Sequence, residues 1–264
     1  MPIINVKNKL EEYRIRASKA DINEMTGRTN NPELSKYVLN NIAEKVSSFE
    51  GTFVDIGCGD GSLFKLIEKK IKHKNNNYIG ILPTKEECNR LKENIKRESN
   101  SRVEIRKGIS KSLPCDKNIA DVVIINGVLL ILENKEEVIE SIKEIQRICK
   151  NNAIVFFGEI PFVDEMKNIQ YGDSIIKWLF SKFFENGLKT FFLKLKYTLR
   201  CLISDEIFLI TNKRILWFEI NEFKEILESL NFKILDLKKH KEINSSRKET
   251  ISKTRANYLA QLIN

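Results

Sequence analysis

Histidine and closely spaced cysteines are scarce in this chain of 264 residues. The two histidines, His73 and His240, lie in lysine-rich polar stretches, which predict solvent-exposed side chains. The five cysteines are widely separated, and no C-x-x-C pair occurs. This spacing indicates neither a zinc site nor a disulfide framework, and two isolated histidines do not suit a histidine-centred triad. We therefore expect no metal.

Long apolar runs are also missing. No run approaches the roughly 20 residues that a membrane-spanning helix needs. The first residues, Met-Pro-Ile-Ile-Asn-Val-Lys, contain no apolar core followed by the small-residue cleavage site of a signal peptide. Charged residues of both signs make up 31% of the chain. These features favour a soluble protein with the cytoplasm as its expected location.

The charge balance is basic, with a formal net charge of +9. Such an excess is compatible with nucleic acid, anionic lipid or a phosphorylated substrate as a partner. Basic residues are interleaved with acids along most of the expected helices, however, as at Lys135-Glu136-Glu137. A nucleic-acid surface would concentrate them in a stripe with stacking aromatic residues. The excess therefore indicates general composition more than a nucleic-acid partner.

The central half of the chain alternates between strand and helix patterns. The expected strands are 52–56, 78–82, 103–107, 120–126 and 153–159, and the expected helices between them are 62–72, 85–98 and 136–149. A helix capped by Asn221 and ending at Leu230, a strand over 232–237, a polar loop over 238–254 and a strand over 257–263 complete the pattern. This order predicts an α/β fold: a doubly wound, Rossmann-like, seven-stranded and mostly parallel sheet.

Two further regions flank or interrupt this core. Residues 1–49 are expected to form an N-terminal helical cap, with Pro32 at a helix start. Residues 50–264 form the core, and a segment rich in Phe, Trp, Leu and Lys over 162–215 is too long for an ordinary connection. This helical insertion has several open roles: a lid over an acceptor, a homodimer interface, plain packing, or a peripheral membrane contact through 175–203.

The most informative motif is Phe53-Val54-Asp55-Ile56-Gly57-Cys58-Gly59-Asp60-Gly61. A short apolar strand ends near an acid, three alternating glycines follow, and a helical pattern begins at Ser62. Strand, glycine-rich turn and helix bring backbone N–H groups against a nucleoside-bearing ligand. A Cβ atom would block either the turn or the approach of that ligand.

The motif resembles motif I of the class I S-adenosylmethionine-dependent methyltransferases, an acid followed by G-x-G-x-G. The resemblance covers residues 50–160 well and 216–263 loosely. It implies a cofactor, S-adenosylmethionine, with S-adenosylhomocysteine as product. The residues that it places at the cofactor are Asp55, Gly57, Cys58, Gly59, Gly61, Leu82, Pro83, Ile109, Asn126 and Arg16.

Two of these positions depart from the family pattern. Relatives have an acid that binds the ribose hydroxyls where this chain has Leu82, and an acid that meets the adenine amino group where it has Ile109. Three alternatives follow from these two departures. Other residues hold the ribose, with Thr84, Lys85 or Glu86 as candidates; or the cofactor binds weakly when no acceptor is present; or the domain has lost the cofactor. Arg16, in an N-terminal segment that covers the cofactor in many relatives, has a solvated helix face as its alternative.

Catalytic residues are harder to predict, because methyl transfer needs chiefly proximity and orientation. The best candidate is Glu159, a carboxylate at the carboxyl end of an expected strand. Its alternative is a surface carboxylate. Tyr171 and Asp173, at the start of the insertion, are weaker candidates that would face the acceptor.

The sequence therefore predicts an S-adenosylmethionine-dependent methyltransferase. Its expected acceptor is a small or carrier-linked molecule, and the layout resembles methyltransferases encoded with bacterial surface-polysaccharide genes, which implies a sugar or phosphoryl precursor. Two alternatives remain: a nucleic-acid methyltransferase, and a partner subunit with a degenerate methyltransferase fold. The apolar Leu82 and Ile109 favour the second alternative, and the intact glycine motif opposes it.

Overall fold

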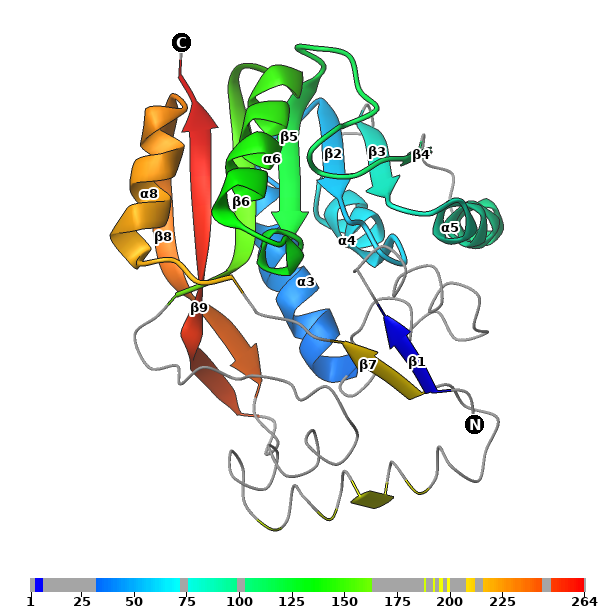
Figure 1. Cartoon of the computed structure of the whole chain (residues 1–264). Coiled ribbons are helices and arrows are strands. Elements are labelled where there is room, and N and C mark those ends of the chain that lie inside the picture. Colours follow the sequence, from blue (N-terminus) through cyan, green and yellow to red (C-terminus); the bar gives the residue numbers. More distant parts are fainter. Residues whose placement is uncertain are drawn as a thin grey trace. The chain divides into compact units, whose positions relative to one another are not determined.

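In the computed structural model (Figure 1), the chain forms two compact units. One unit comprises residues 1–15 and 166–215, and the other comprises residues 16–165 and 216–264. The structure describes residues 3–6, 32–71, 76–98, 103–162, 188, 192, 195–196, 199, 208–211, 216–243 and 248–263.

The smaller unit joins the beginning of the chain to the insertion. Strand β1 (Ile3–Val6) pairs in parallel with β7 (Phe208–Thr211). The first residues of the expected N-terminal cap thus belong with the insertion. Three apolar side chains within the segment 175–203 are exposed: Leu188, Phe192 and Leu199. The membrane contact and the homodimer interface predicted for this segment stay predictions.

The larger unit is built on a seven-stranded sheet in the order β4-β3-β2-β5-β6-β9-β8. Its strands are β2 (Thr52–Ile56), β3 (Asn77–Leu82), β4 (Val103–Lys107), β5 (Ala120–Asn126), β6 (Cys149–Pro161), β8 (Phe232–Ile243) and β9 (Glu249–Leu262). The five strands from β4 to β6 pair in parallel, and β9 is antiparallel to both β6 and β8. The predicted doubly wound, seven-stranded, mostly parallel sheet is confirmed.

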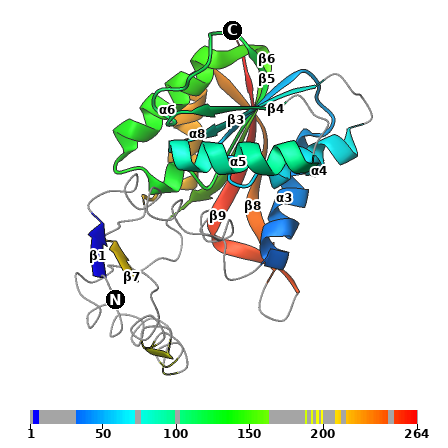
Figure 2. The same ribbon diagram turned by 90° about the vertical axis from the view of Figure 1, so that its right-hand side faces the viewer.

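Helices cover both faces of this sheet (Figure 2). They are α3 (Pro32–Val46), α4 (Ser62–Lys70), α5 (Lys85–Glu98), α6 (Lys135–Ile148) and α8 (Ile220–Ser229), with a short 3-10 turn η1 (Leu129–Ile131). None of the helices among the described residues is long and apolar enough to cross a bilayer.

Alternation along the central strands divides the core into two apolar layers. On β5, Val123 and Ile125 pack with α6 and α8, whereas Val122 and Ile124 pack with α3, α4 and α5. All four of these side chains are buried. A strand buried on both faces reads as a continuous apolar run, which is why β5 was predictable from its sequence.

The edge of the sheet differs from the prediction. The polar stretch 238–254 was expected to be a loop, but β8 continues to Ile243 and β9 begins at Glu249. That expectation was wrong because lysine-rich strands at a sheet edge face water and resemble loops in composition. The end of β9 does alternate as a strand should, with Ala256, Tyr258, Ala260 and Leu262 buried.

The start of α8 also differs. Asn221 was predicted to cap this helix, but the N-cap is Glu219, and Asn221 is the second helical residue. The side chains of Glu219 and Glu222 accept hydrogen bonds from each other's backbone N–H groups in a capping box. Such a box satisfies two N–H groups that the first turn would otherwise leave unpaired.

Candidate functional site

The glycine motif forms a tight turn between β2 and α4. Gly57, Gly59 and Gly61 all have left-handed backbones, with φ values of 79°, 57° and 73°. The Gly57 N–H donates to the Ile81 carbonyl at 2.8 Å, and the Gly61 N–H donates to the Cys58 carbonyl at 3.0 Å. The repeated positive φ explains the three glycines, since residues with a Cβ atom rarely adopt this conformation.

Gly57 is exposed and lies where the strand order reverses. β2 has β3 on one side and β5 on the other, and a crevice opens at such a switch point. A Cβ atom on Gly57 would lie 2.5 Å from Val128 Cγ2, in the segment that follows β5. The absence of a side chain at Gly57 therefore lets Val128 pack closely against the turn.

Asp55 and Cys58 lie beneath this turn. Asp55 is buried at the end of β2, opposite Gly80 on β3 and Ile124 on β5. Burial raises the pKa of the Cys58 thiol well above its usual value, and the nearby Asp55 carboxylate adds to the shift. Cys58 is thus a neutral packing residue, and the role predicted for Asp55, organising the turn, stays a prediction.

The end of β3 is apolar, and its last side chain is buried. Leu82 is only 2% exposed and packs in the layer that contains α4 and α5. Pro83 follows it, and Thr84 then begins α5 by accepting from the Glu87 N–H at 3.2 Å while its hydroxyl donates to Glu87 Oε2 at 2.7 Å. Burial raises the pKa of Glu87, and the hydrogen bonds from Thr84 oppose this shift.

Ile109, at the end of β4, has the opposite environment to Leu82. Its side chain is 43% exposed, which is unusual for a large apolar residue. The backbone around it is fixed, because the Gly108 N–H donates to the Leu82 carbonyl at 2.9 Å and the Ser112 N–H donates to the Ile109 carbonyl at 3.0 Å. Leu82 and Ile109 thus occupy the two expected positions without supplying a carboxylate.

Asn126 ends β5 and reaches toward β6. Its Nδ2 donates to Glu159 Oε1 at 3.1 Å, whereas its buried Oδ1 has no hydrogen-bond partner. A Cβ atom on Gly158 would lie 2.1 Å from that Oδ1 atom, so the glycine makes room for the amide. Leaving a buried polar atom unpaired costs about 1–3 kcal/mol.

Glu159 is held in an unusual conformation at the carboxyl end of β6. Its φ is 57°, and the pairing of β6 with β9 is interrupted between Phe157 and Ile160. Three other described non-glycine residues have positive φ, and all are asparagines, which tolerate it. For glutamate the cost is about 1–3 kcal/mol, and such strain clusters at functional sites.

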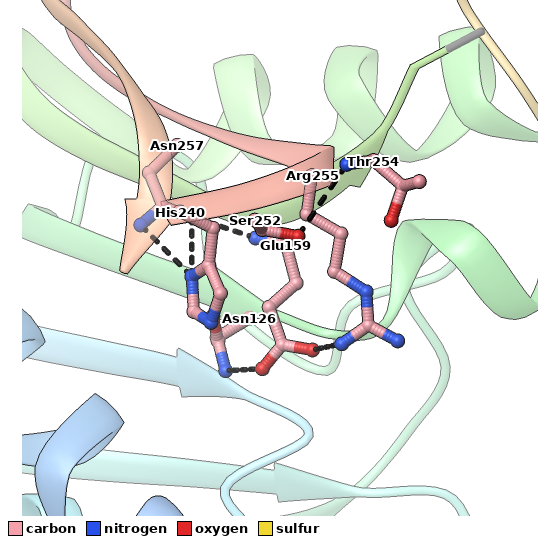
Figure 3. Close-up of polar contacts among 7 residues, drawn as sticks. All are labelled: Asn126, Glu159, His240, Ser252, Thr254, Arg255 and Asn257. Carbon is pink, nitrogen blue, oxygen red and sulfur yellow. Dashed lines mark hydrogen bonds and ion pairs between the residues drawn. The ribbon is translucent and has the colours of Figure 1, made fainter. Parts of the chain in front are cut away.

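The hairpin of β8 and β9 supplies further partners of Glu159 (Figure 3). Arg255 Nη1 contacts Glu159 Oε2 at 2.6 Å, and the Glu159 N–H donates to Asn257 Oδ1 at 2.9 Å. The Asn257 Nδ2 atom lies 3.2 Å from His240 Nδ1. Asn257 Oδ1 lies 3.3 Å from the same nitrogen, so the tautomer of the imidazole decides which of the two amide atoms pairs with His240.

His240 corrects one prediction. It was expected to be a solvated surface residue, but it is only 4% exposed. Burial lowers the pKa of His240, and the nearby Glu159 carboxylate only partly opposes the shift. The expectation failed because it rested on the lysines next to His240, which point to the opposite, exposed side of an edge strand.

The structure brings together some predicted site residues and adds others. Asn126 and Glu159 are in direct contact, and Arg255, Asn257 and His240 join them without having been predicted. The alternation of β9 was the signal that would have placed Arg255 and Asn257 on one face. Arg16, Tyr171 and Asp173 lie outside the described residues. The roles assigned to the predicted site residues stay predictions.

No metal arrangement is found within the described ranges. Among those residues, no group of three or more His, Cys, Asp or Glu side chains is placed to hold a metal ion. Four cysteines are described, at positions 58, 88, 115 and 149, and all are buried free thiols.

Comparison with known proteins identifies the fold. Residues 54–157 match the family model described as a methyltransferase domain. The sheet, turn and helices of the chain have the fold of solved S-adenosylmethionine-dependent methyltransferases. No curated protein matches the chain.

Several solved structures share the fold of this methyltransferase domain. A SAM-dependent methyltransferase from Aquifex aeolicus has a TM-score of 0.56 at 14% identity, covering 93% of this chain and 100% of its own. One from Leishmania major has a TM-score of 0.58 at 13% identity, covering 96% and 80%. The [4+2]-cyclase SpnF has a TM-score of 0.59 at 14% identity, covering 99% and 98%. Since a cyclase shares this fold, the reaction must be argued from the site.

Proposed function

We propose that this methyltransferase domain binds S-adenosylmethionine against the turn 57–61 and transfers its methyl group to a small or carrier-linked acceptor. The observation that carries the proposal is the run of three left-handed glycines, at φ values of 79°, 57° and 73°, between a buried strand and a helix. The turn lies at the switch point of the sheet, where open α/β folds bind ligands. The bound cofactor supplies an electrophilic methyl group on a sulfonium.

The residues around the turn fit such a ligand in part. Gly57 is exposed and has no side chain, which suits the close approach of the methionine portion. Pro83 and the exposed Ile109 offer apolar contact to an adenine ring, and Asn126 lies at the end of β5 beside Val128. The ribose and adenine acids of the family are absent, so we expect weaker polar anchoring than in relatives.

The acceptor is proposed from the layout of the chain. The insertion over 162–215 and the Leu82-Pro83-Thr84 sequence resemble those of methyltransferases that modify surface-polysaccharide precursors. A sugar or phosphoryl group on a nucleotide- or lipid-linked precursor is therefore our candidate. The interleaving of basic and acidic residues makes nucleic acid the weaker candidate.

Calorimetric titration with S-adenosylmethionine and S-adenosylhomocysteine tests the cofactor. We expect saturable binding with a micromolar dissociation constant for the wild-type protein. Failure to bind either ligand at millimolar concentration, with a cooperative thermal transition showing that the protein is folded, contradicts the proposal. The chain would then be better explained as a partner subunit with a degenerate site, the reading that Leu82 and Ile109 favour.

Ile109→Asp is expected to tighten S-adenosylmethionine binding by roughly tenfold or more. The position is 43% exposed, so a carboxylate there stays hydrated and can accept from the adenine amino group. A charge-assisted hydrogen bond contributes about 1.5–3 kcal/mol, and each 1.4 kcal/mol corresponds to a factor of ten in affinity. The dissociation constants of wild type and variant, measured by the same titration, give the effect.

Ile109→Asn is the matched control for this substitution. Asparagine has nearly the same size as aspartate, and both substitutions remove the isoleucine side chain. The asparagine amide, however, carries no charge. We expect Ile109→Asn to gain clearly less affinity than Ile109→Asp. Equal or weaker binding of Ile109→Asp relative to wild type would mean that the adenine amino group does not lie at this position.

A further inference from the structure

Four apolar residues of the insertion form a stripe along one side of a helix. The described residues 188, 192, 195, 196 and 199 all have helical backbones. Leu188, Phe192, Leu195 and Leu199 follow one another at spacings of four, three and four residues, which places them on one helix face. Leu188 is 61% exposed, Phe192 59% and Leu199 50%. These four residues, the insertion stripe, are thus presented largely outward.

Such a stripe differs from the other exposed apolar residues of the chain. Large apolar side chains at helical spacing normally pack against a core. Apolar side chains that are exposed singly need no explanation, whereas a contiguous group marks an interaction surface. Among the described residues outside the insertion, the large exposed apolar side chains are Ile109, Leu235, Ile251 and Ile263, and none of them lies on a helix. The insertion stripe is therefore the candidate for a docking surface.

The segment that carries the stripe is strongly basic. Residues 175–203 contain six Lys or Arg residues and one acidic residue, so the segment has a net charge of +5, more than half of the +9 of the whole chain. Lys196, beside Leu195, is exposed. A lysine at this place can lay its alkyl chain along an apolar surface while its ammonium group reaches a negatively charged one. The segment thus combines an apolar face with concentrated positive charge.

We propose that the insertion stripe docks on the surface of a bilayer that contains anionic lipids. Leu188 and Leu199, at the two ends of the stripe, then enter the boundary between headgroups and acyl chains. The basic residues of 175–203 supply the attraction to the anionic headgroups. Apolar residues along one face, accompanied by lysine and arginine, are typical of helices that lie in the plane of a membrane surface. Docking does not require S-adenosylmethionine, so this proposal is independent of the proposed function.

Charge distinguishes a bilayer from two other occupants of the stripe. A second copy of the chain would bring its own segment of charge +5 against the first, and like charges at close range oppose association. A nucleic acid would match the charge, but leucine side chains neither stack on bases nor form hydrogen bonds with them. Of the three, an anionic bilayer alone offers an apolar layer and negative charge at one surface.

Vesicle sedimentation with the full-length protein tests the proposal. Vesicles of phosphatidylcholine alone are compared with vesicles of phosphatidylcholine and phosphatidylglycerol in equal amounts. We expect binding to the anionic vesicles to be at least about tenfold stronger, since each basic residue near such a surface adds to the attraction. The preference should fall as salt is added, because salt screens the charges. Equal binding to the two compositions, or binding to neither, overturns the proposal.

The double substitution Leu188→Glu with Leu199→Glu tests the stripe itself. Each change removes an apolar contact with the bilayer and adds a charge that anionic lipids repel, so we expect binding to anionic vesicles to fall by more than about tenfold. Ile251→Glu with Ile263→Glu is the matched control, since it makes the same change of charge at two exposed apolar positions of the larger unit. The control should bind within about threefold of wild type, because distant charges are screened. Wild-type binding by the stripe variant overturns the proposal.

Further measurements on the same variants separate docking from its alternatives. A dimer in sedimentation velocity that the stripe substitutions dissociate would place the stripe between two copies and overturn the proposal. A melting temperature that falls in the stripe variant but not in the control would also overturn it, because the stripe would then pack within the chain. Binding to an oligonucleotide that is tighter than binding to anionic vesicles would assign the basic segment to nucleic acid instead.

Titration with S-adenosylmethionine keeps this proposal apart from the proposed function. We expect the stripe variant to bind the cofactor with the affinity of the wild-type protein while its binding to vesicles is lost. That result supports docking through the stripe. Absence of cofactor binding in the wild-type protein would contradict the proposed function alone, because sedimentation with vesicles is measured without the cofactor.

Discussion

Gly57→Arg is expected to weaken S-adenosylmethionine binding by more than about a hundredfold. Three effects act together. The backbone at Gly57 has a φ of 79°, which costs a residue with a side chain about 1–3 kcal/mol. Its Cβ atom would meet Val128 Cγ2 at 2.5 Å, so either the turn or the segment after β5 must shift. The remaining side chain would then fill the crevice that the ligand needs.

The titration must separate loss of the site from loss of the fold. Gly57 is exposed, so the arginine side chain is not forced into the core, and we expect the variant to remain folded. Asn151→Arg is the matched control: it adds the same side chain at an exposed position near the amino end of β6, away from the carboxyl ends. Binding by a folded Gly57→Arg protein with wild-type affinity would show that the turn does not contact the cofactor.

The sheet could be predicted largely because its strands carry unambiguous signals. β5 is a continuous apolar run, and β2 runs directly into glycines whose positive φ leaves few alternatives. The edge hairpin of β8 and β9 carried a weaker signal, because its lysines face water and give the segment a composition typical of a loop. The turn between strand and helix was thus predictable from local sequence, whereas the hairpin depended on pairing between distant segments.

The site was predictable in part for the same reason. Glu159 and Asn126 were found because each ends a recognisable strand. Their partners Arg255 and Asn257 are about a hundred residues away in sequence, and nothing local indicates that they meet Glu159. The kink at Glu159, with its φ of 57°, is likewise stabilised by Asn257 from another strand and could not be read from neighbouring residues.

Leu82→Asp, the substitution that restores the family's ribose acid, is expected to lower the free energy of unfolding by about 3–5 kcal/mol. Leu82 is 2% exposed and packs in the same layer as Phe64, Cys88 and Leu91. An aspartate there loses the apolar contacts and places a carboxyl group among apolar side chains. Urea unfolding of wild type and variant, followed by circular dichroism, measures the difference.

The pH dependence identifies the cause of that loss. Burial would raise the pKa of the new carboxyl group in the folded state above its unfolded value of about 4, so the folded protein retains the proton that the unfolded chain releases. The destabilisation should therefore be smallest near pH 4 and grow as the pH rises toward neutrality. Ile109→Asp, at a 43% exposed position, should show little loss and no such growth.

This result would also bear on how the ribose is held. If Leu82→Asp destabilises the fold as expected, a carboxylate at position 82 requires repacking of the layer around α4 and α5. The hydroxyl groups of a bound ribose must then find partners elsewhere, such as Lys85 or Glu86, because the third predicted candidate, Thr84, is buried and its hydroxyl is bonded to Glu87. A Leu82→Asp protein as stable as wild type, with tighter cofactor binding, would instead mean that position 82 turns toward the ligand. The backbone at position 82 would then still be placed to direct a carboxylate at the ribose, and only the acidic side chain would be missing.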